Sequence, residues 1–148
     1  MKKNEVKMNN KGFSLVELIV VIAIMAVLVG VLAPLFIRYV EKSRQSTDLQ
    51  NLDSIVTVVE AYYADKENTG STSVTFTLGQ TVSDTNLANE LVAAGVIKAA
   101  DKELPLKGTK WTDNPACTYT PSTGGKVYAG KSSYYDCSAD TNQPPKAI

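Results

Sequence analysis

The stretch KGFSLVELIVVIAIMAVLVGVLAPLFIRYVEKSR, residues 11–44, decides how this chain folds. Between Glu17 and Arg38 it contains 20 consecutive residues without a charge. A helix of that length extends about 30 Å, which matches the thickness of the hydrocarbon core of a bilayer. The sequence therefore predicts a membrane-spanning helix near the N-terminus.

Charge is distributed unevenly around this apolar run. The chain has 15 basic and 15 acidic residues, but residues 1–12 hold four lysines against one glutamate. Basic residues that flank a span are retained in the cytoplasm, so we expect everything after Arg38 to be exported. The remainder of the chain is mildly acidic and shows no basic patch in its sequence, which predicts no direct nucleic-acid site.

Histidine is absent from the chain. Its absence removes the Ser-His-Asp and Cys-His arrangements, HExxH zinc sites and most general bases that act near neutral pH. The carboxylates Glu103, Asp136 and Asp140 have no spacing that distinguishes them from solvated side chains. An enzyme is the weakest function class, and we predict no catalytic residue, metal site or cofactor.

The apolar run has two simple interpretations. An ordinary signal peptide has an apolar stretch of about 7–15 residues followed by a small-x-small cleavage site, and neither property fits here. A plain membrane anchor fits the length but leaves Glu17 unexplained, because a charge within a membrane helix costs about 2.5–3.5 kcal/mol and usually has a partner. No basic residue lies within one helical turn of Glu17. Cleavage after Gly12 would create a suitable cation, the free amine of Phe13.

Residues 11–18, KGFSLVEL, resemble the class III signal-peptide motif of type IV pilins and pseudopilins. The resemblance implies that a prepilin peptidase cuts between Gly12 and Phe13 and methylates the new amine of Phe13. It also implies that Glu17 neutralises this amine during filament assembly. The absence of a side chain at Gly12 suits a protease cleft. The resemblance is specific over residues 11–40 and says little about residues 70–148.

Gly30 and Pro34 are expected to interrupt the membrane helix. Proline removes one backbone hydrogen bond and clashes with the carbonyl four residues earlier, which here belongs to Gly30. A kinked membrane helix is common and explains both residues. The resemblance implies in addition that the helix unwinds near Pro34 when subunits pack in a filament.

After Arg38 the pattern becomes amphipathic, and one helix from about Ser14 to about Glu67 is expected. Its buried face in the second half is predicted from apolar residues at helical spacing, namely Leu49, Leu52, Val56, Val59 and Tyr63. Charged and polar residues such as Asp48 and Asp53 are assigned to the other sides.

The rest of the chain predicts a short helix and a sheet. A short strand or extended loop is expected over residues 74–78, and a helix over 84–94, with Ser83 or Asp84 as its N-cap and Gly95 at its C-terminus. Short strands are expected at residues 110–112, 117–120 and 126–129, the last two joined by a hairpin loop. A long helix, membrane-spanning in its first half and packed on a small antiparallel sheet, is an α+β arrangement. It is also the pilin fold that the resemblance implies.

Cys117 and Cys137 are the only cysteines, and both lie on the exported side. An even count in an exported domain favours a disulfide between them. Free thiols or a metal pair remain open, although a two-cysteine metal site would lack further ligands. Many pilins have a similar C-terminal disulfide, which agrees with the pairing.

The sequence thus predicts three segments, a cleaved leader (1–12), a transmembrane assembly helix (13–38) and an exported globular domain (39–148). We expect a type IV pilin subunit that is anchored in the membrane and then assembled into a surface homopolymer. Its expected partners are the prepilin peptidase and pilus assembly platform proteins. A pseudopilin of a type II secretion or competence system, and an anchored binding domain that does not polymerise, are the alternatives.

Overall fold

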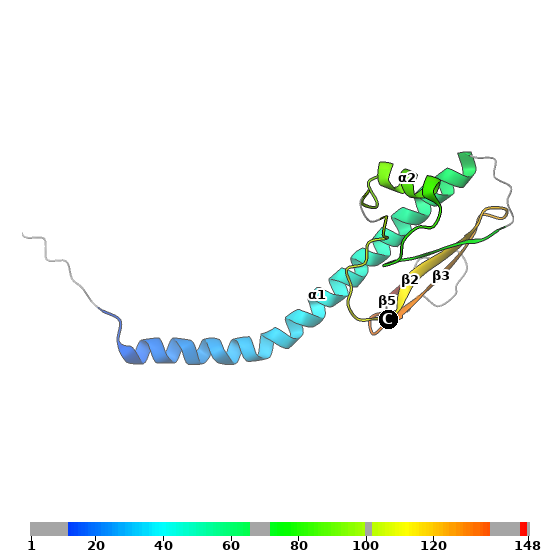
Figure 1. Ribbon diagram of the computed structural model, residues 1–148. Coiled ribbons are helices and arrows are strands. Elements are labelled where there is room, and N and C mark those ends of the chain that lie inside the picture. Colours follow the sequence, from blue (N-terminus) through cyan, green and yellow to red (C-terminus); the bar gives the residue numbers. More distant parts are fainter. Residues whose placement is uncertain (1–11, 66–71, 100–101, 137–145, 148) are drawn as a thin grey trace, which may run out of the picture. The chain divides into compact units, whose positions relative to one another are not determined.

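The computed structural model describes residues 12–65, 72–99, 102–136 and 146–147. The chain divides into two compact units, Met1–Arg38 and Tyr39–Ile148. Helix α1 (Leu15–Asp65) contributes to both, with its N-terminal part in the first unit and its C-terminal part in the second (Figure 1).

The described part of the first unit is helical and apolar on all sides. Every residue from 12 to 39 is exposed. Helices that are hydrophobic all round are normally buried in a protein core or in a membrane. Nothing within the described part of this unit covers the helix, so its surface is available to lipid or to another protein.

The expected interruption at Gly30 and Pro34 is wrong for the single chain, because α1 is helical through both residues. A proline removes one hydrogen bond from the ladder and strains one turn. The long aliphatic stretches on both sides retain their own hydrogen bonds, and in a membrane helix local adjustment satisfies the groups that proline frees. Unwinding near Pro34 in a packed filament concerns a different state and stays a prediction.

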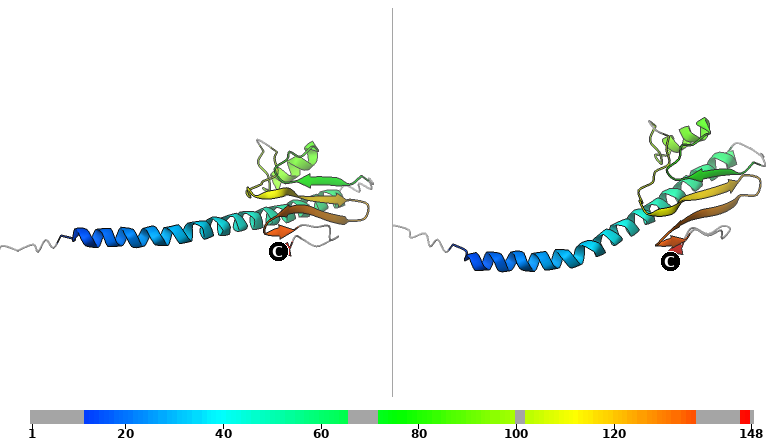
Figure 2. Two further views of the ribbon diagram at one scale, coloured as in Figure 1. Left: turned by 90° about the horizontal axis from the view of Figure 1, so that it is seen from below. Right: turned by 60° about the horizontal axis from the view of Figure 1, so that its bottom comes forward.

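The second unit combines the C-terminal part of α1 with a short helix and an antiparallel sheet. The helix is α2 (Thr85–Ala93). The described strands are β1 (Val74–Thr77), β2 (Trp111–Thr120), β3 (Gly125–Ser132), β4 (Tyr135–Asp136) and β5 (Lys146–Ala147), and they pair in sequence order. Figure 2 shows this sheet and α2 gathered around the C-terminal part of α1. The predicted α+β class is confirmed.

One stripe of α1 supplies much of the core of the second unit. Its side chains meet Phe76 from β1, Leu91 from α2 and Tyr128 from β3. Full burial of one such aliphatic side chain contributes about 1.5–3 kcal/mol. The buried residues of the stripe are Glu41, Gln45, Asp48, Leu52, Ile55, Val56 and Val59. The prediction was correct for the apolar centre, but Leu49 and Tyr63 are only half-buried and Asp48 faces inward.

Helix α2 begins and ends as its sequence predicts. The Asp84 side chain caps the N-terminus by accepting hydrogen bonds from the amides of Asn86 and Leu87 at 2.9 and 3.3 Å. Gly95 has a φ of +73° at the C-terminus, where a left-handed residue ends the helix. The amide of the following residue, Val96, then donates to the carbonyl of Leu91. Local chemistry is sufficient to define this helix.

Strand β2 differs from the prediction of two separate short strands. It runs continuously from Trp111 to Thr120, with irregular pairing to β3 before Ala116. Pro115 lies in this irregular part and has no amide hydrogen to donate to the ladder. Opposite it, Gly130 has a φ of +126°, and a Cβ there would lie 2.8 Å from Cα of Pro115. The close approach of the two backbones therefore requires a glycine.

Candidate processing and assembly site

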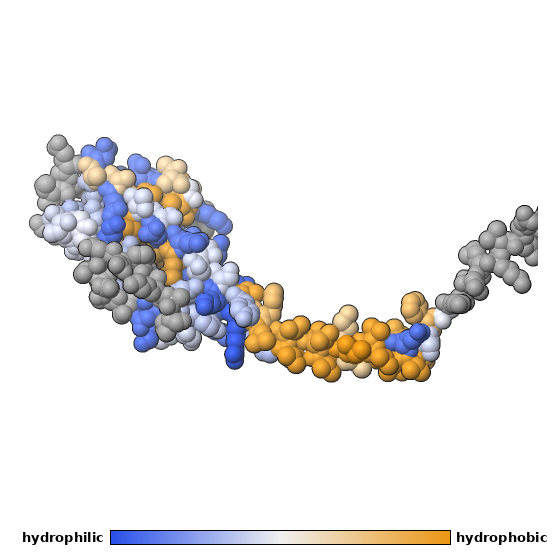
Figure 3. All heavy atoms as spheres, turned by 180° about the vertical axis from the view of Figure 1, so that it is seen from behind, coloured by the Kyte–Doolittle hydropathy of each residue, from blue (hydrophilic) through white to orange (hydrophobic). Residues whose placement is uncertain are grey.

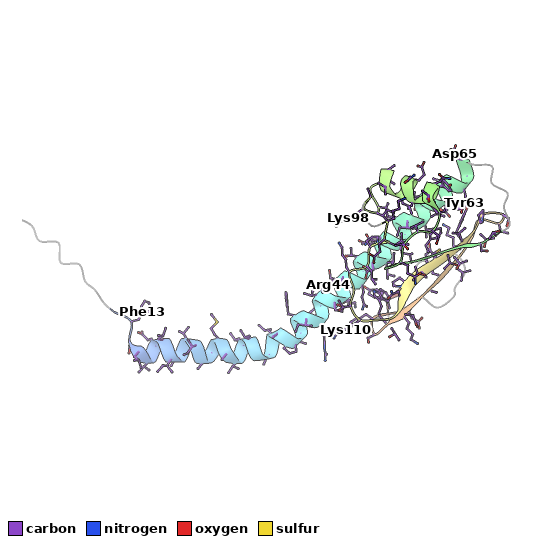
Figure 4. All side chains as sticks on the ribbon, viewed as in Figure 1. Phe13, Arg44, Tyr63, Asp65, Lys98 and Lys110 are labelled. Carbon is purple, nitrogen blue, oxygen red and sulfur yellow. The ribbon has the colours of Figure 1, made fainter. Side chains whose placement is uncertain are left out.

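Three exposed residues, Gly12, Phe13 and Ser14, precede α1. A Cβ on Gly12 would meet no atom within 4 Å, and the side chain of Phe13 is 93% exposed. Figure 4 shows Phe13 immediately before the helix. Among the described residues, nothing packs over the bond between Gly12 and Phe13, so this bond is open to a protease. The cut and the methylation themselves remain predictions.

The side chain of Glu17 lies in the first turn of α1 and caps the N-terminus of the helix. The carbonyl of Ser14 accepts the hydrogen bond of the Leu18 amide at 3.2 Å, and the amide of Ser14 donates to Glu17 Oε2 at 2.9 Å. A glutamate at the third helical position that binds the amide of the N-cap residue is one half of a capping box. The negative charge also lies at the positive end of the helix dipole. Our sequence reasoning missed this bond, although the order Ser14-x-x-Glu17 before an apolar run is its usual signal.

The capping bond occupies one oxygen of the Glu17 carboxylate. In the part of the chain that the structure describes, no hydrogen bond reaches the other oxygen, Oε1. Glu17 lines a shallow hollow together with Phe13, Val16 and Val20. A carboxylate with an open oxygen and apolar neighbours favours a cation as its partner.

The helix beyond Glu17 is suited to apolar surroundings. The large apolar side chains from Leu15 to Ile37 are 45–73% exposed, and Figure 3 shows them as one continuous hydrophobic surface. By length and composition, α1 is the one helix in the described chain that is able to cross a membrane. A contiguous apolar surface of this kind marks contact with a membrane or with another protein.

Two further carboxylates of α1 have a different environment, within the second unit. Asp48 is fully buried and accepts hydrogen bonds from the amides of Lys107 and Gly108, each at 2.7 Å, and from Trp111 Nε1 at 2.9 Å. A Cβ on Gly108 would lie 2.8 Å from Asp48 Oδ2, so only a glycine fits at this contact. The side chain holds the segment before β2 against the helix.

Glu41 makes a similar set of bonds seven residues, or about two helical turns, before Asp48 on the same stripe. It accepts from the amides of Thr109 and Lys110 at 2.8 and 2.9 Å and from Thr109 Oγ1 at 3.1 Å. Gln45 donates to Glu41 and accepts from Ser132 at the end of β3, at 3.1 and 2.7 Å. Burial alone raises the pKa of Glu41, but the hydrogen bonds from Lys110, Thr109 and Gln45 together outweigh it and lower the pKa.

Glu41, Gln45 and Asp48 therefore form a polar anchor for residues 107–111. The sequence signal was their spacing, because they continue the stripe of Leu52 and Ile55 at helical intervals. The anchor has a structural role, since every oxygen of its carboxylates is bonded to the protein. Within the described ranges, no group of three or more His, Cys, Asp or Glu side chains is arranged to hold a metal ion.

Cys117 lies in the core of the second unit with no exposed surface. The structure gives it as a free thiol. Burial is the main cause that raises the pKa of this thiol to about 11. Cys137 lies outside the described residues, so the disulfide stays a prediction.

Comparisons with known proteins find similarity over part of the chain. A family model for the prokaryotic N-terminal methylation motif matches residues 7–33. The chain is 31% identical to a type IV major pilin protein, PilA of Myxococcus xanthus, over 67 residues, which are 45% of this chain and 30% of that protein. It is 44% identical to prepilin peptidase-dependent protein A of Clostridium perfringens over 75 residues, which are 50% of this chain and 52% of that protein.

The chain thus spans about a third to a half of the length of these two relatives. No solved structure matches it. The predicted resemblance to type IV pilins is confirmed as an N-terminal methylation motif joined to a pilin-like helix and sheet.

Proposed function

We propose that this pilin-like chain is the precursor of a type IV pilin subunit, which is cut between Gly12 and Phe13 and polymerises into a surface filament. One observation carries the proposal, the placement of Glu17 in the first turn of an exposed apolar helix with one carboxylate oxygen open. The motif match over residues 7–33 supports it.

Each residue of the segment has a role in this proposal. The lysines before Gly12 hold the N-terminus in the cytoplasm. Cleavage at Gly12 leaves the whole apolar helix in the product, whereas ordinary signal peptidase removes the apolar stretch. The new amine on Phe13 is a cation, and methylation leaves its charge in place. Pairing of this amine with Glu17 of an adjacent copy offsets the cost of holding both charges in apolar surroundings.

The same proposal defines the partners and the location of the chain. Before assembly the apolar helix anchors it in the cell membrane, with the second unit on the outside. A prepilin peptidase and the assembly platform of a pilus then process the subunit and add it to a filament. The names of the two relatives refer to a pilin and to peptidase dependence, which supports both steps.

N-terminal mass spectrometry of protein sheared from the cell surface tests this function. We expect a mature chain that begins with methylated Phe13, and an intact leader in a strain without the peptidase. Replacing Gly12 by a bulky residue (Gly12→Leu) should leave an uncut precursor, because the side chain blocks close approach of the backbone to the protease. A surface protein that retains its lysine-rich leader would contradict the proposal and leave an anchored domain.

A pseudopilin is the second candidate, because the same motif serves both kinds of subunit. The name of the Clostridium relative refers to peptidase dependence and not to a filament. Electron microscopy with antibodies against this chain separates the two candidates. Long extracellular filaments identify a pilin, and short assemblies confined to the cell envelope identify a pseudopilin.

A further inference from the structure

Four cations form a basic collar at one end of the second unit, Lys42 and Arg44 on α1 and Lys107 and Lys110 before β2. The collar exists because Asp48 binds the amide of Lys107 and Glu41 binds the amide of Lys110. These bonds fix the segment beside α1. The side chains of all four cations are exposed, and none has an ion pair within the described part of the chain.

The positive charge of the collar is not compensated by its neighbours. Two carboxylates of the same stretch of α1, Glu41 and Asp48, face inward and are saturated by backbone and side-chain donors. The next acid along β2, Asp113, is exposed and makes no ion pair with the four cations in the described residues; its register partner, Lys131, pairs with Asp136. The four cations of the collar therefore present their charges to the solvent without an ion pair among the described residues.

The other end of the same unit carries an acidic groove. It lies between α1 and α2, has a volume of about 570 Å³ and is lined by Val58, Ala61, Asp65, Glu90, Ala93 and Ala94, among others. Asp65 and Glu90 are exposed, and neither has an ion pair in the residues that the structure describes. Figure 4 shows Asp65 at the far end of α1 from Arg44 and Lys110. An apolar floor with an acidic rim suits long cationic side chains, whose stems are apolar.

Within one molecule the collar and the groove cannot meet. Arg44 and Asp65 belong to one continuous helix and are 21 residues apart, which corresponds to about 32 Å along its axis. A second copy displaced along the helix by that distance brings opposite charges together. We propose that the acidic groove of one copy receives the basic collar of a second copy, which sets the axial stagger of the subunits. The inference rests on the proposed polymerisation.

Anionic lipid headgroups would also attract the collar, because it follows the apolar run closely in the chain. Lipid at the collar would leave the groove, about 32 Å away along α1, without a partner. A second copy provides an oppositely charged partner for the collar and for the groove through a single kind of contact. Charge complementarity therefore favours a copy of the chain over lipid.

Charge-swap variants of the full chain, expressed in its own cells, test the proposal. One chain carries Lys42→Glu, Arg44→Glu and Lys110→Glu, a second carries Asp65→Lys and Glu90→Lys, and a third combines all five changes. Each single set places like charges opposite each other and should reduce the yield of sheared filament about tenfold, whereas the combined chain should recover to within about twofold of the wild type. Lys98→Glu, an exposed lysine outside the collar, is the matched control and should leave the yield unchanged.

The outcomes separate this proposal from the proposed function. Mass spectrometry of each variant first verifies cleavage after Gly12, and if trimmed wild-type chains form no filament, polymerisation itself is wrong. If wild-type filaments form but the combined chain stays as poor as the single sets, the collar and groove do not pair. Loss of co-purified anionic lipid from the collar variant, with normal filaments from the groove variant, would identify lipid as the occupant and overturn the inference.

Discussion

Helix α1 carries an exposed carboxylate, Glu17, and a buried one, Asp48, and their hydrogen-bond donors differ. Glu17, in the first unit, receives one hydrogen bond from an amide three residues away. Asp48, in the second unit, receives three from groups 59–63 residues away. Local donors hold Glu17 in the helix without satisfying it, whereas distant donors satisfy Asp48 completely.

The difference in hydrogen-bond donors indicates different roles for the N-terminal and C-terminal parts of α1. A carboxylate with an open oxygen in apolar surroundings remains ready for a charged partner from another molecule. A carboxylate saturated by distant amides joins parts of one fold and is lost only when the fold is lost. Removing Glu17 should therefore affect assembly alone, and removing Asp48 should affect stability.

The largest effect is expected from Glu17→Ala. The chain should be inserted and trimmed normally, but the yield of sheared filament should fall about a hundredfold, because the Phe13 amine is left unpaired in apolar surroundings at a cost of several kcal/mol. The thermal stability of the second unit should not change. Immunoblots of sheared and cell-bound protein provide the measurement.

Glu17→Gln is the matched control for this effect. The amide oxygen of glutamine still accepts the hydrogen bond of the Ser14 amide, so the capping bond persists while the charge is removed. We expect filament loss close to that of the alanine variant. Normal filaments from the glutamine variant would show that capping, and not charge pairing, is the role of Glu17.

Asp48→Ala should destabilise the second unit by about 2–4 kcal/mol, because one buried and two part-buried donors lose their acceptor. The single tryptophan, Trp111, is one of these donors, so its fluorescence reports unfolding in urea with the mature chain in detergent. Asp53→Ala, an exposed carboxylate on the same helix, should change stability by no more than about 0.5 kcal/mol. Equal effects of the two variants would refute the anchor.

Reduction of the predicted Cys117–Cys137 disulfide should cost about 3 kcal/mol, from the entropy of closing a loop of that length in the unfolded chain. Alkylation of the unfolded chain with and without a reducing agent, followed by intact mass, tests the bond. Two alkylated cysteines without reduction would exclude it. An unpaired Cys117 should then resist alkylation in the folded chain, because its thiol is buried and its pKa is raised to about 11.

How far the sequence predicts this molecule depends on the range of each contact. The hydrogen bonds of the segment from Gly12 to Glu17 and of the caps of α2 join residues that are close in the sequence. They can therefore be predicted from the identities of neighbouring residues. The polar anchor was missed because the donors of Asp48 are mostly backbone amides, which every segment offers, and only folding brings residues 107–111 to the helix. The collar was missed for the same reason, since its four cations come from two distant segments.

The smallest expected effect concerns Glu41 and pH. Hydrogen bonds from Lys110, Thr109 and Gln45 outweigh burial and lower the pKa of Glu41 in the folded chain below its ordinary value, about 4.3. A lowered pKa contributes stability above the unfolded value, and this contribution is lost as the pH falls through the folded value. Glu41→Gln should therefore be less stable than the wild type by about 1–2 kcal/mol at pH 7.

The difference between these two chains should shrink as the pH falls from about 5 to 3, measured by thermal unfolding at each pH. Thr109→Val provides a second test, because it removes the Oγ1 donor and keeps the charge of Glu41. Loss of that donor raises the pKa of Glu41 toward its ordinary value, so the loss of stability on acidification should be smaller than in the wild type and should be complete at a higher pH. A constant difference between Glu41→Gln and the wild type at every pH would mean that Glu41 acts only as a neutral acceptor. Glu41 would then differ from Glu17 in the number and position of its hydrogen-bond donors, and the charge of Glu41 would make no contribution to stability.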